Sequence, residues 1–90
     1  MKKHKKLLIK GRVQKVGYRA STLEAALQNN ISGNVKNTPD GNVKIDAEGE
    51  EEDLQKFITW CFKGPFWAKV TEIEEKEESL IGYDNFEIVR

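Results

Sequence analysis

Apolar and polar positions alternate near the start of the chain. Positions 7, 9, 11 and 13 hold Leu, Ile, Gly and Val, while most positions between them are polar. A period of two predicts a strand with one apolar face. From about Ala20 the apolar residues return at helical spacing, and Asn29-Asn30 suits a left-handed helix end. We therefore expect a strand from Leu7 to Val13, followed by a helix.

Two short strands and a hairpin turn are predicted next. The strands are expected over residues 32–37 and 42–48, and the second alternates apolar with charged side chains. Between them, Thr38-Pro39-Asp40-Gly41 places proline where φ must be near −65° and glycine where φ is expected to be positive. This segment is therefore predicted to form a hairpin.

A second helix and two further strands complete the predicted elements. Leu54, Phe57, Ile58 and Cys61 follow the i, i+3, i+4, i+7 pattern of an amphipathic helix. Four acidic residues precede it, and Lys63-Gly64-Pro65 is a typical helix end. Strands are expected over residues 68–77 and 86–89.

The element order is β-α-β-β-α-β plus a short C-terminal strand. It predicts an α+β, ferredoxin-like two-layer sandwich, with an antiparallel sheet and both helices on one face. In this arrangement the first two strands are parallel and one strand apart, roughly 10 Å at about 4.8 Å per strand. The loop at residues 14–19 and Asn37 are therefore expected at the same rim of the sheet.

Length and composition indicate one small globular domain over residues 1–90. Hydrophobic residues make up 38% of the chain and charged residues 33%. No apolar run approaches the roughly 20 residues that cross a bilayer, and the N-terminal segment lacks the apolar core of a secretory signal. Cys61 is the single cysteine, so no internal disulfide forms, and it is expected to be a small buried hydrophobe. The expected location is cytoplasmic.

Charge is segregated along the chain although the fifteen basic and fifteen acidic residues cancel. Every charged residue from Lys2 to Arg19 is basic, and the acidic residues gather in two later blocks. The basic end therefore favours an anionic ligand. Residues 1–6 are expected to be a disordered basic tail, since termini fray, and His4 within it is expected to have no chemical role.

The segment from Gly11 to Arg19 is the best candidate for chemistry. It runs from a strand through a basic loop into the start of a helix, where unpaired backbone N–H groups and the helix dipole favour anions. Arg19 adds a planar fork of donors that matches phosphate oxygens. A solvated turn with no ligand remains an alternative for this loop taken alone.

These residues resemble the acylphosphatase family over nearly the whole chain from Leu7. The family's loop motif reads V-Q-G-V-x-[FY]-R, and a second motif reads G-x-V-x-N-x-x-D-G. Both occur here at the right separation, the first with one departure and the second complete. The matching positions are Val13, Gln14, Val16, Tyr18 and Arg19 for the first motif and Gly33, Val35, Asn37, Asp40 and Gly41 for the second. Glu48-Gly49, Gly64-Pro65, Ala68, Val70 and Phe86-Glu87-Ile88 add to the resemblance.

The resemblance implies a hydrolase that cleaves small acyl phosphates to carboxylate and inorganic phosphate. It implies that Arg19 binds the phosphate and that Asn37 holds the attacking water, with no metal or cofactor. The implied phosphate-binding loop consists of Gln14, Lys15, Val16, Gly17, Tyr18 and Arg19. Ser21 and Thr38 neighbour this site and are candidates to hydrogen-bond its residues. A monomer without nucleic-acid or membrane partners is expected.

Lys15 departs from the family pattern, which has glycine at this position. A glycine in a phosphate cradle usually supplies positive φ or a close backbone approach, so lysine there costs on the order of 1 kcal/mol if φ is positive. An alternative function is therefore an acylphosphatase-like domain that binds phosphate with weak or no turnover. An RNA-binding module shares the element order, but residues 42–46 carry none of the aromatic side chains that stack on bases.

Overall fold

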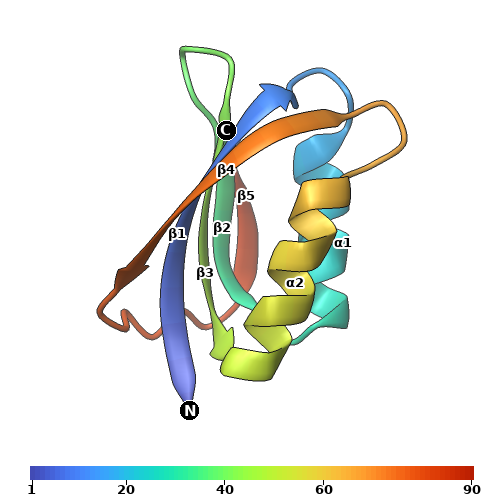
Figure 1. Ribbon diagram of the computed structural model, residues 1–90. Helices are drawn as coiled ribbons and strands as arrows, with labels where there is room; N and C mark the ends of the chain where they lie inside the picture. Colours follow the sequence, from blue (N-terminus) through green and yellow to red (C-terminus); the bar gives the residue numbers. More distant parts are fainter.

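The computed structural model describes all residues of the chain, 1–90, as five strands and two helices. These are β1 (Lys2–Arg12), α1 (Tyr18–Gln28), β2 (Ser32–Asn37), β3 (Val43–Glu50), α2 (Glu51–Lys63), β4 (Lys69–Glu78) and β5 (Phe86–Val89). Both helices cover one face of the sheet (Figure 1). The predicted ferredoxin-like sandwich is confirmed. Neither helix is long and apolar enough to cross a membrane.

The five strands form one sheet in the order β4-β1-β3-β2-β5. β3 lies between β1 and β2 and is antiparallel to both, so β1 and β2 run the same way, as predicted. β5 pairs with β2 in parallel, with Gly33 opposite Phe86 and Val35 opposite Ile88. The sheet is therefore mixed and not wholly antiparallel, because residues 79–85 carry the chain from one edge of the sheet to the other before β5 begins.

The expected disordered tail is instead the first half of β1. Residues 2–9 pair with β3, and residues 4–12 pair with β4, so this segment is an inner strand of the sheet. Its cations meet the acidic block of β4, as in the ion pairs Lys10–Glu74 at 2.8 Å and Lys5–Glu75 at 3.6 Å. Opposite charges placed across two strands favour pairing. The basic start of the sequence and its later acidic blocks therefore neutralise each other in the fold.

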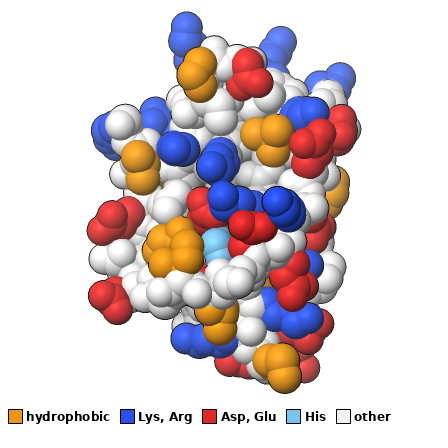
Figure 2. All heavy atoms as spheres, turned by 90° about the vertical axis from the view of Figure 1, so that its left-hand side faces the viewer, with side chains coloured by type: hydrophobic (Ala, Val, Ile, Leu, Met, Phe, Trp, Pro, Cys, Tyr) orange, Lys and Arg blue, Asp and Glu red, His pale blue; other side chains and the backbone are white.

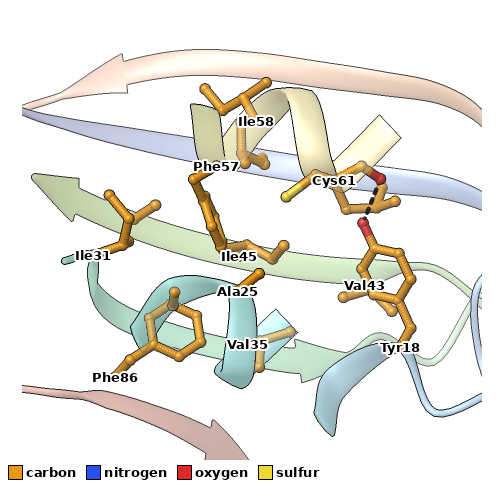
Figure 3. Packing of buried hydrophobic residues seen from close by; sticks show 14 of the residues in the cluster. Tyr18, Ala25, Ile31, Val35, Val43, Ile45, Phe57, Ile58, Cys61 and Phe86 are labelled. Atoms are coloured by element: carbon orange, nitrogen blue, oxygen red, sulfur yellow. Dashed lines mark hydrogen bonds between the residues drawn. The ribbon is translucent and has the colours of Figure 1, made fainter. Parts of the chain in front are cut away.

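The core lies between the sheet and the two helices. α2 contributes Phe57, Ile58 and Cys61, which pack onto Val43 and Ile45 of β3 in the close-up of Figure 3. α1 approaches closely because it buries small residues, Ala25 and Ala26 among them. Complete burial of a side chain such as Phe57 stabilises the fold by about 1.5–3 kcal/mol. The packed helices hold the sheet, including the rim where β1 and β2 end, in a fixed arrangement.

Candidate active site

A hollow of about 160 Å³ opens at the rim where β1, β2 and β5 end or turn. Its wall combines the loop after β1, the first turn of α1, the end of β2 and the C-terminal end of β5. The lining residues are Val13, Lys15, Gly17, Tyr18, Arg19, Ala20, Asn37, Ile88 and Arg90. The fold therefore brings Arg19 and Asn37 to one concave site, as the parallel arrangement of β1 and β2 predicts.

The start of α1 is open to an anion. Gly17 is the N-cap residue with φ of +77°, no side chain caps the helix, and its first turn has no acidic residue. The first N–H groups of a helix have no partner within the helix and carry its positive dipole end. Gly17 suits this position because glycine adopts positive φ without steric cost. The backbone thus offers several donors to a bound anion.

Three cations line the hollow, and no acidic side chain does. Lys15, Arg19 and Arg90 are all among the lining residues, and none of them takes part in an ion pair. A concave surface lined by one sign of charge concentrates the electric field and attracts the opposite charge. The hollow therefore favours a small ligand of high negative charge.

Asn37 provides an unpaired acceptor at the site. It ends β2 opposite Val43, and its Oδ1 is buried without any hydrogen-bond partner in the protein. A buried unsatisfied polar atom costs about 1–3 kcal/mol, so such atoms are uncommon away from functional sites. Asn37 also lines the hollow, so its side-chain amide lies close to any small ligand that binds there.

The side chain of Gln14 connects the loop after β1 to the hairpin turn after β2. Its Nε2 donates to the carbonyl oxygens of Thr38, at 2.9 Å, and Asn42, at 2.7 Å. Thr38 is itself occupied within the hairpin turn, where its Oγ1 donates to Asp40 and accepts from the N–H of Asn42. Gln14 and Thr38 do not line the hollow. They hold the loop after β1 against the turn that follows Asn37.

Tyr18 lines the hollow, but its hydroxyl turns into the core. It donates to the carbonyl oxygen of Cys61 at 2.8 Å (Figure 3). That carbonyl would normally accept from the N–H four residues later, which is missing because residue 65 is proline. Burial raises the pKa of Tyr18 far above its usual value and raises the pKa of Cys61 to about 12. Tyr18 therefore fastens the start of α1 to the end of α2, and the Cys61 thiol is an inert buried group, as predicted.

Two other expected site residues lie away from the hollow. Val16 is half-buried against the hydrophobic core, and Ser21 lines a separate surface hollow beside Trp60. Ser21 follows the first turn of α1 and points along a different side of the helix from Arg19. The structure places neither side chain among the residues that line the hollow.

Known proteins with the same fold and sequence pattern identify the family. The family model described as Acylphosphatase matches residues 5–88. The chain belongs to the acylphosphatase family. The acylphosphatase of Acaryochloris marina is 45% identical over 94% of this chain and 91% of its own length. The solved acylphosphatase of Bacillus subtilis is 40% identical and covers both chains completely with a TM-score of 0.95, and that of Coxiella burnetii is 27% identical over 98% and 93% with a TM-score of 0.94.

Lys15 stands where the acylphosphatase loop motif has glycine, and its backbone keeps a left-handed conformation. Its φ is +64°, in the region that non-glycine residues adopt at a cost of about 1–2 kcal/mol. The lysine side chain is exposed. The loop of this family member therefore retains a glycine-like backbone and adds a cation to the hollow.

Ile88 and Arg90 belong to the hollow although the sequence did not point to them. They are brought there by the parallel pairing of β5 with β2, whose last residue is Asn37. The pairing partner of the last strand depends on the path of residues 79–85 and is not encoded in the hydrophobic pattern of β5.

In this acylphosphatase fold, no cluster of three or more His, Cys, Asp or Glu side chains is arranged to hold a metal ion.

Proposed function

We propose that this chain hydrolyses small acyl phosphates to a carboxylate and inorganic phosphate, without a metal ion. The observation that carries the proposal is one hollow that combines the open start of α1, three cations and the unpaired Oδ1 of Asn37. The family assignment supports the same reaction class.

In this proposal the phosphoryl group binds at the start of α1. The N–H groups of the first turn and the guanidinium of Arg19 donate to its oxygens, and Lys15 and Arg90 add positive charge around it. Phosphoryl transfer depends largely on positioning and on electrostatic stabilisation of the transition state. The acyl group then points out of the hollow toward solvent.

Asn37 orients the water that attacks phosphorus. Its Oδ1 accepts a hydrogen bond from the water, whose oxygen bonds to phosphorus while the bond from phosphorus to the acyl oxygen breaks. The leaving group departs with that electron pair as a carboxylate, whose acid has a pKa of about 4–5 like a side-chain carboxyl, so it needs no proton donor. No lining residue is Asp, Glu or His, so the proton of the water passes to an oxygen of the phosphoryl group.

The alternative is a phosphate-binding domain with little turnover, and Lys15 is the observation that favours it. If lysine displaced the loop, the phosphoryl group would sit badly for attack. Positive φ at Lys15 instead supports hydrolysis, because the backbone keeps the conformation that a glycine would supply. Only a turnover measurement distinguishes the two functions.

The experiment measures hydrolysis of benzoyl phosphate by the wild-type chain, by Asn37→Ala and by Lys36→Ala. Lys36 is the neighbouring residue of β2, is exposed and does not line the hollow, so it is the matched control. We expect Asn37→Ala to lower kcat by roughly 100-fold or more, with phosphate affinity within a few fold of wild type. Lys36→Ala and an added chelator should leave kcat unchanged. Wild-type turnover at the uncatalysed rate, with intact phosphate binding, would support the alternative.

A further inference from the structure

Residues 79–85 cross from the β4 edge to the β5 edge of the sheet, on the face opposite the helices. We call this stretch the crossing segment. Figure 2 looks onto that face, where basic side chains gather beside acidic ones. Leu80 and Ile81 of the crossing segment are 55% and 63% exposed, so apolar burial does little to hold it. Its attachment therefore rests on polar contacts and on the half-buried Tyr83.

The carboxylate of Glu48 binds the middle of the crossing segment. It accepts hydrogen bonds from three consecutive backbone N–H groups, those of Ile81, Gly82 at 3.0 Å and Tyr83 at 3.1 Å. Glu48 lies on β3 and is only 4% exposed. Burial alone would raise the pKa of Glu48, but the three N–H donors and the charge of His4 outweigh it and lower the pKa. Glu48 therefore stays ionised in its buried position.

His4 binds the start of the crossing segment and is almost completely buried. Its Nδ1 lies 2.9 Å from the carbonyl oxygen of Ser79, and its Nε2 lies 2.9 Å from Oδ1 of Asp46. Both partners are acceptors, and a neutral imidazole has only one N–H to donate. Only the imidazolium ion makes both hydrogen bonds. The edge of the Tyr83 ring packs against His4 with the ring centroids 5.9 Å apart.

The charges around His4 also favour the imidazolium. Burial lowers the pKa of His4, but the hydrogen bonds to Ser79 and Asp46 and the charges of Asp46 and Glu48 outweigh it and raise the pKa above 6.5. Glu78 of β4 lies opposite His4 in the strand register. Burial, and then the charge of Asp46, raises the pKa of Tyr83, so its hydroxyl stays neutral near neutral pH.

Lysines on the same face, among them Lys6 and Lys76, reduce the excess of negative charge without replacing His4. Lys76 pairs with Glu78 at 3.6 Å. Lys6 lies opposite Asp46 in the register of β1 and β3 but makes no ion pair. Neither lysine contacts the crossing segment in any hydrogen bond. Loss of the proton from His4 would thus leave Asp46 and Glu48 buried together without a cation between them.

We propose that His4 and Glu48 form a clasp that fixes the crossing segment to the open face of the sheet and thereby positions β5 beside the active site. The crossing segment leads directly into β5, which pairs with β2 and carries Ile88 into the wall of the hollow. The clasp closes when His4 is an imidazolium and Glu48 is a carboxylate. His4 is a positioning residue here, because it reaches the hollow only through β5.

The clasp gives the molecule a defined pH window. The pKa of His4 is raised in the folded chain, so its stabilising contribution is complete below 6.5 and is lost as pH rises through the raised pKa. The pKa of Glu48 is lowered, so its contribution is present above 4.5 and is lost as pH falls through the lowered pKa. The crossing segment is held most firmly between these two limits.

The test uses the folded chain without substrate, so it does not depend on the proposed hydrolysis. His4 is the single histidine, so its ring protons give an unambiguous NMR titration. Amide hydrogen exchange of Ile81, Gly82 and Tyr83 is measured over the same pH range and corrected for intrinsic exchange. We expect a pKa above 6.5 and a fall in protection of about 10-fold or more as His4 titrates, the scale of one lost charge-assisted hydrogen bond.

Two variants complete the test. His4→Gln should expose the three amides to exchange at every pH and remove the pH dependence, and it should weaken phosphate binding a few fold near neutral pH. Lys6→Gln removes a cation from the same strand and face but leaves the hydrogen bonds of the clasp in place, so the three amides should stay protected while His4 is charged and should lose protection as His4 titrates. A His4 pKa below 6.5, or protection in the wild-type chain that does not change as His4 titrates, would overturn the proposal even if His4→Gln failed to fold.

Discussion

Lys15 allows a direct test of how this member of the family tolerates lysine with positive φ in the loop after β1. Two properties of the residue are separable, because its backbone has φ of +64° and its side chain adds a charge to the hollow. Lys15→Ala removes the charge and keeps a side chain in the left-handed conformation. Lys15→Gly removes the charge and the steric cost together. The difference between the two variants therefore isolates the backbone.

The magnitudes follow from these two properties. A non-glycine residue in the left-handed region costs about 1–2 kcal/mol of folding free energy, which glycine avoids. Glycine also gives the unfolded chain more conformational freedom, and this offsets about 0.4–1 kcal/mol of that gain. Lys15→Gly should therefore exceed Lys15→Ala in unfolding free energy by about 0.5–1 kcal/mol, or about 2–8 °C in Tm for a domain of this size. An exposed cation contributes about 0.2–1 kcal/mol to anion binding, so both variants should lose phosphate affinity by about 1.4- to 5-fold.

Thermal unfolding and phosphate inhibition of benzoyl phosphate turnover, at low and moderate salt, measure both effects. Both variants should show a weaker salt dependence of phosphate binding than wild type, because one screened charge is missing. Equal stability of the alanine and glycine variants would refute the steric argument. A several-fold gain in kcat/KM in Lys15→Gly but not in Lys15→Ala would show that lysine distorts the loop, in favour of the phosphate-binding alternative.

Three further substitutions test the remaining parts of the site. Arg19→Ala should lower kcat/KM by about 100-fold or more in steady-state kinetics, and Arg19→Lys should recover only part of it because the planar fork is lost. Gln14→Leu should lower kcat more than it raises KM, because it releases the loop from the hairpin turn without removing a phosphate ligand; an unchanged kcat would contradict that role. Tyr18→Phe should reduce the unfolding free energy by about 1–3 kcal/mol in denaturant titrations, since it leaves the carbonyl of Cys61 unpaired, and an equally stable variant would contradict the contact.

The elements that local pattern determines were predicted closely. The strands at residues 32–37 and 86–89 have the predicted bounds, and the turn at residues 38–41 joins β2 and β3 with Gly41 at φ of +91°. Asn30 adopts φ of +58° just after the end of α1, as its sequence predicts. Turns and helix ends are local because a few adjacent residues carry their conformational preferences. The sequence was therefore sufficient for these features.

The first six residues were mispredicted because their structure is not local. A run of lysines has no hydrophobic period and no strand propensity of its own. Its partners are the acidic residues of β4 and β3, about half the chain or more away in sequence, and His4 is buried only because the crossing segment covers it. Segregated charge indicated an anionic ligand when read along the chain. In the fold, the same charges serve mainly to pair strands.

For the site, the sequence predicted that Arg19 and Asn37 meet, but neither the full set of lining residues nor what each side chain does. The family motif includes Gln14 and Tyr18, yet the structure uses their polar atoms to fasten the loop and α1 to neighbouring elements. Ile88 and Arg90 were missed because their position depends on the parallel placement of β5. A motif records positions, whereas the direction of a side chain depends on packing across the fold.

The site keeps two unfavourable features that the rest of the domain supports. The buried Oδ1 of Asn37 and the left-handed backbone of Lys15 cost about 1–3 and 1–2 kcal/mol, a substantial part of the 5–15 kcal/mol that stabilises a typical domain. Hydrogen bonds fix the chain beside each of them. Those of Gln14 hold the loop next to Lys15, and those between β2 and β3 hold Asn37. The rigid contacts around the site therefore preserve a geometry that neither residue would adopt alone, and a hydrogen-bond donor bound beside Asn37 would satisfy its Oδ1.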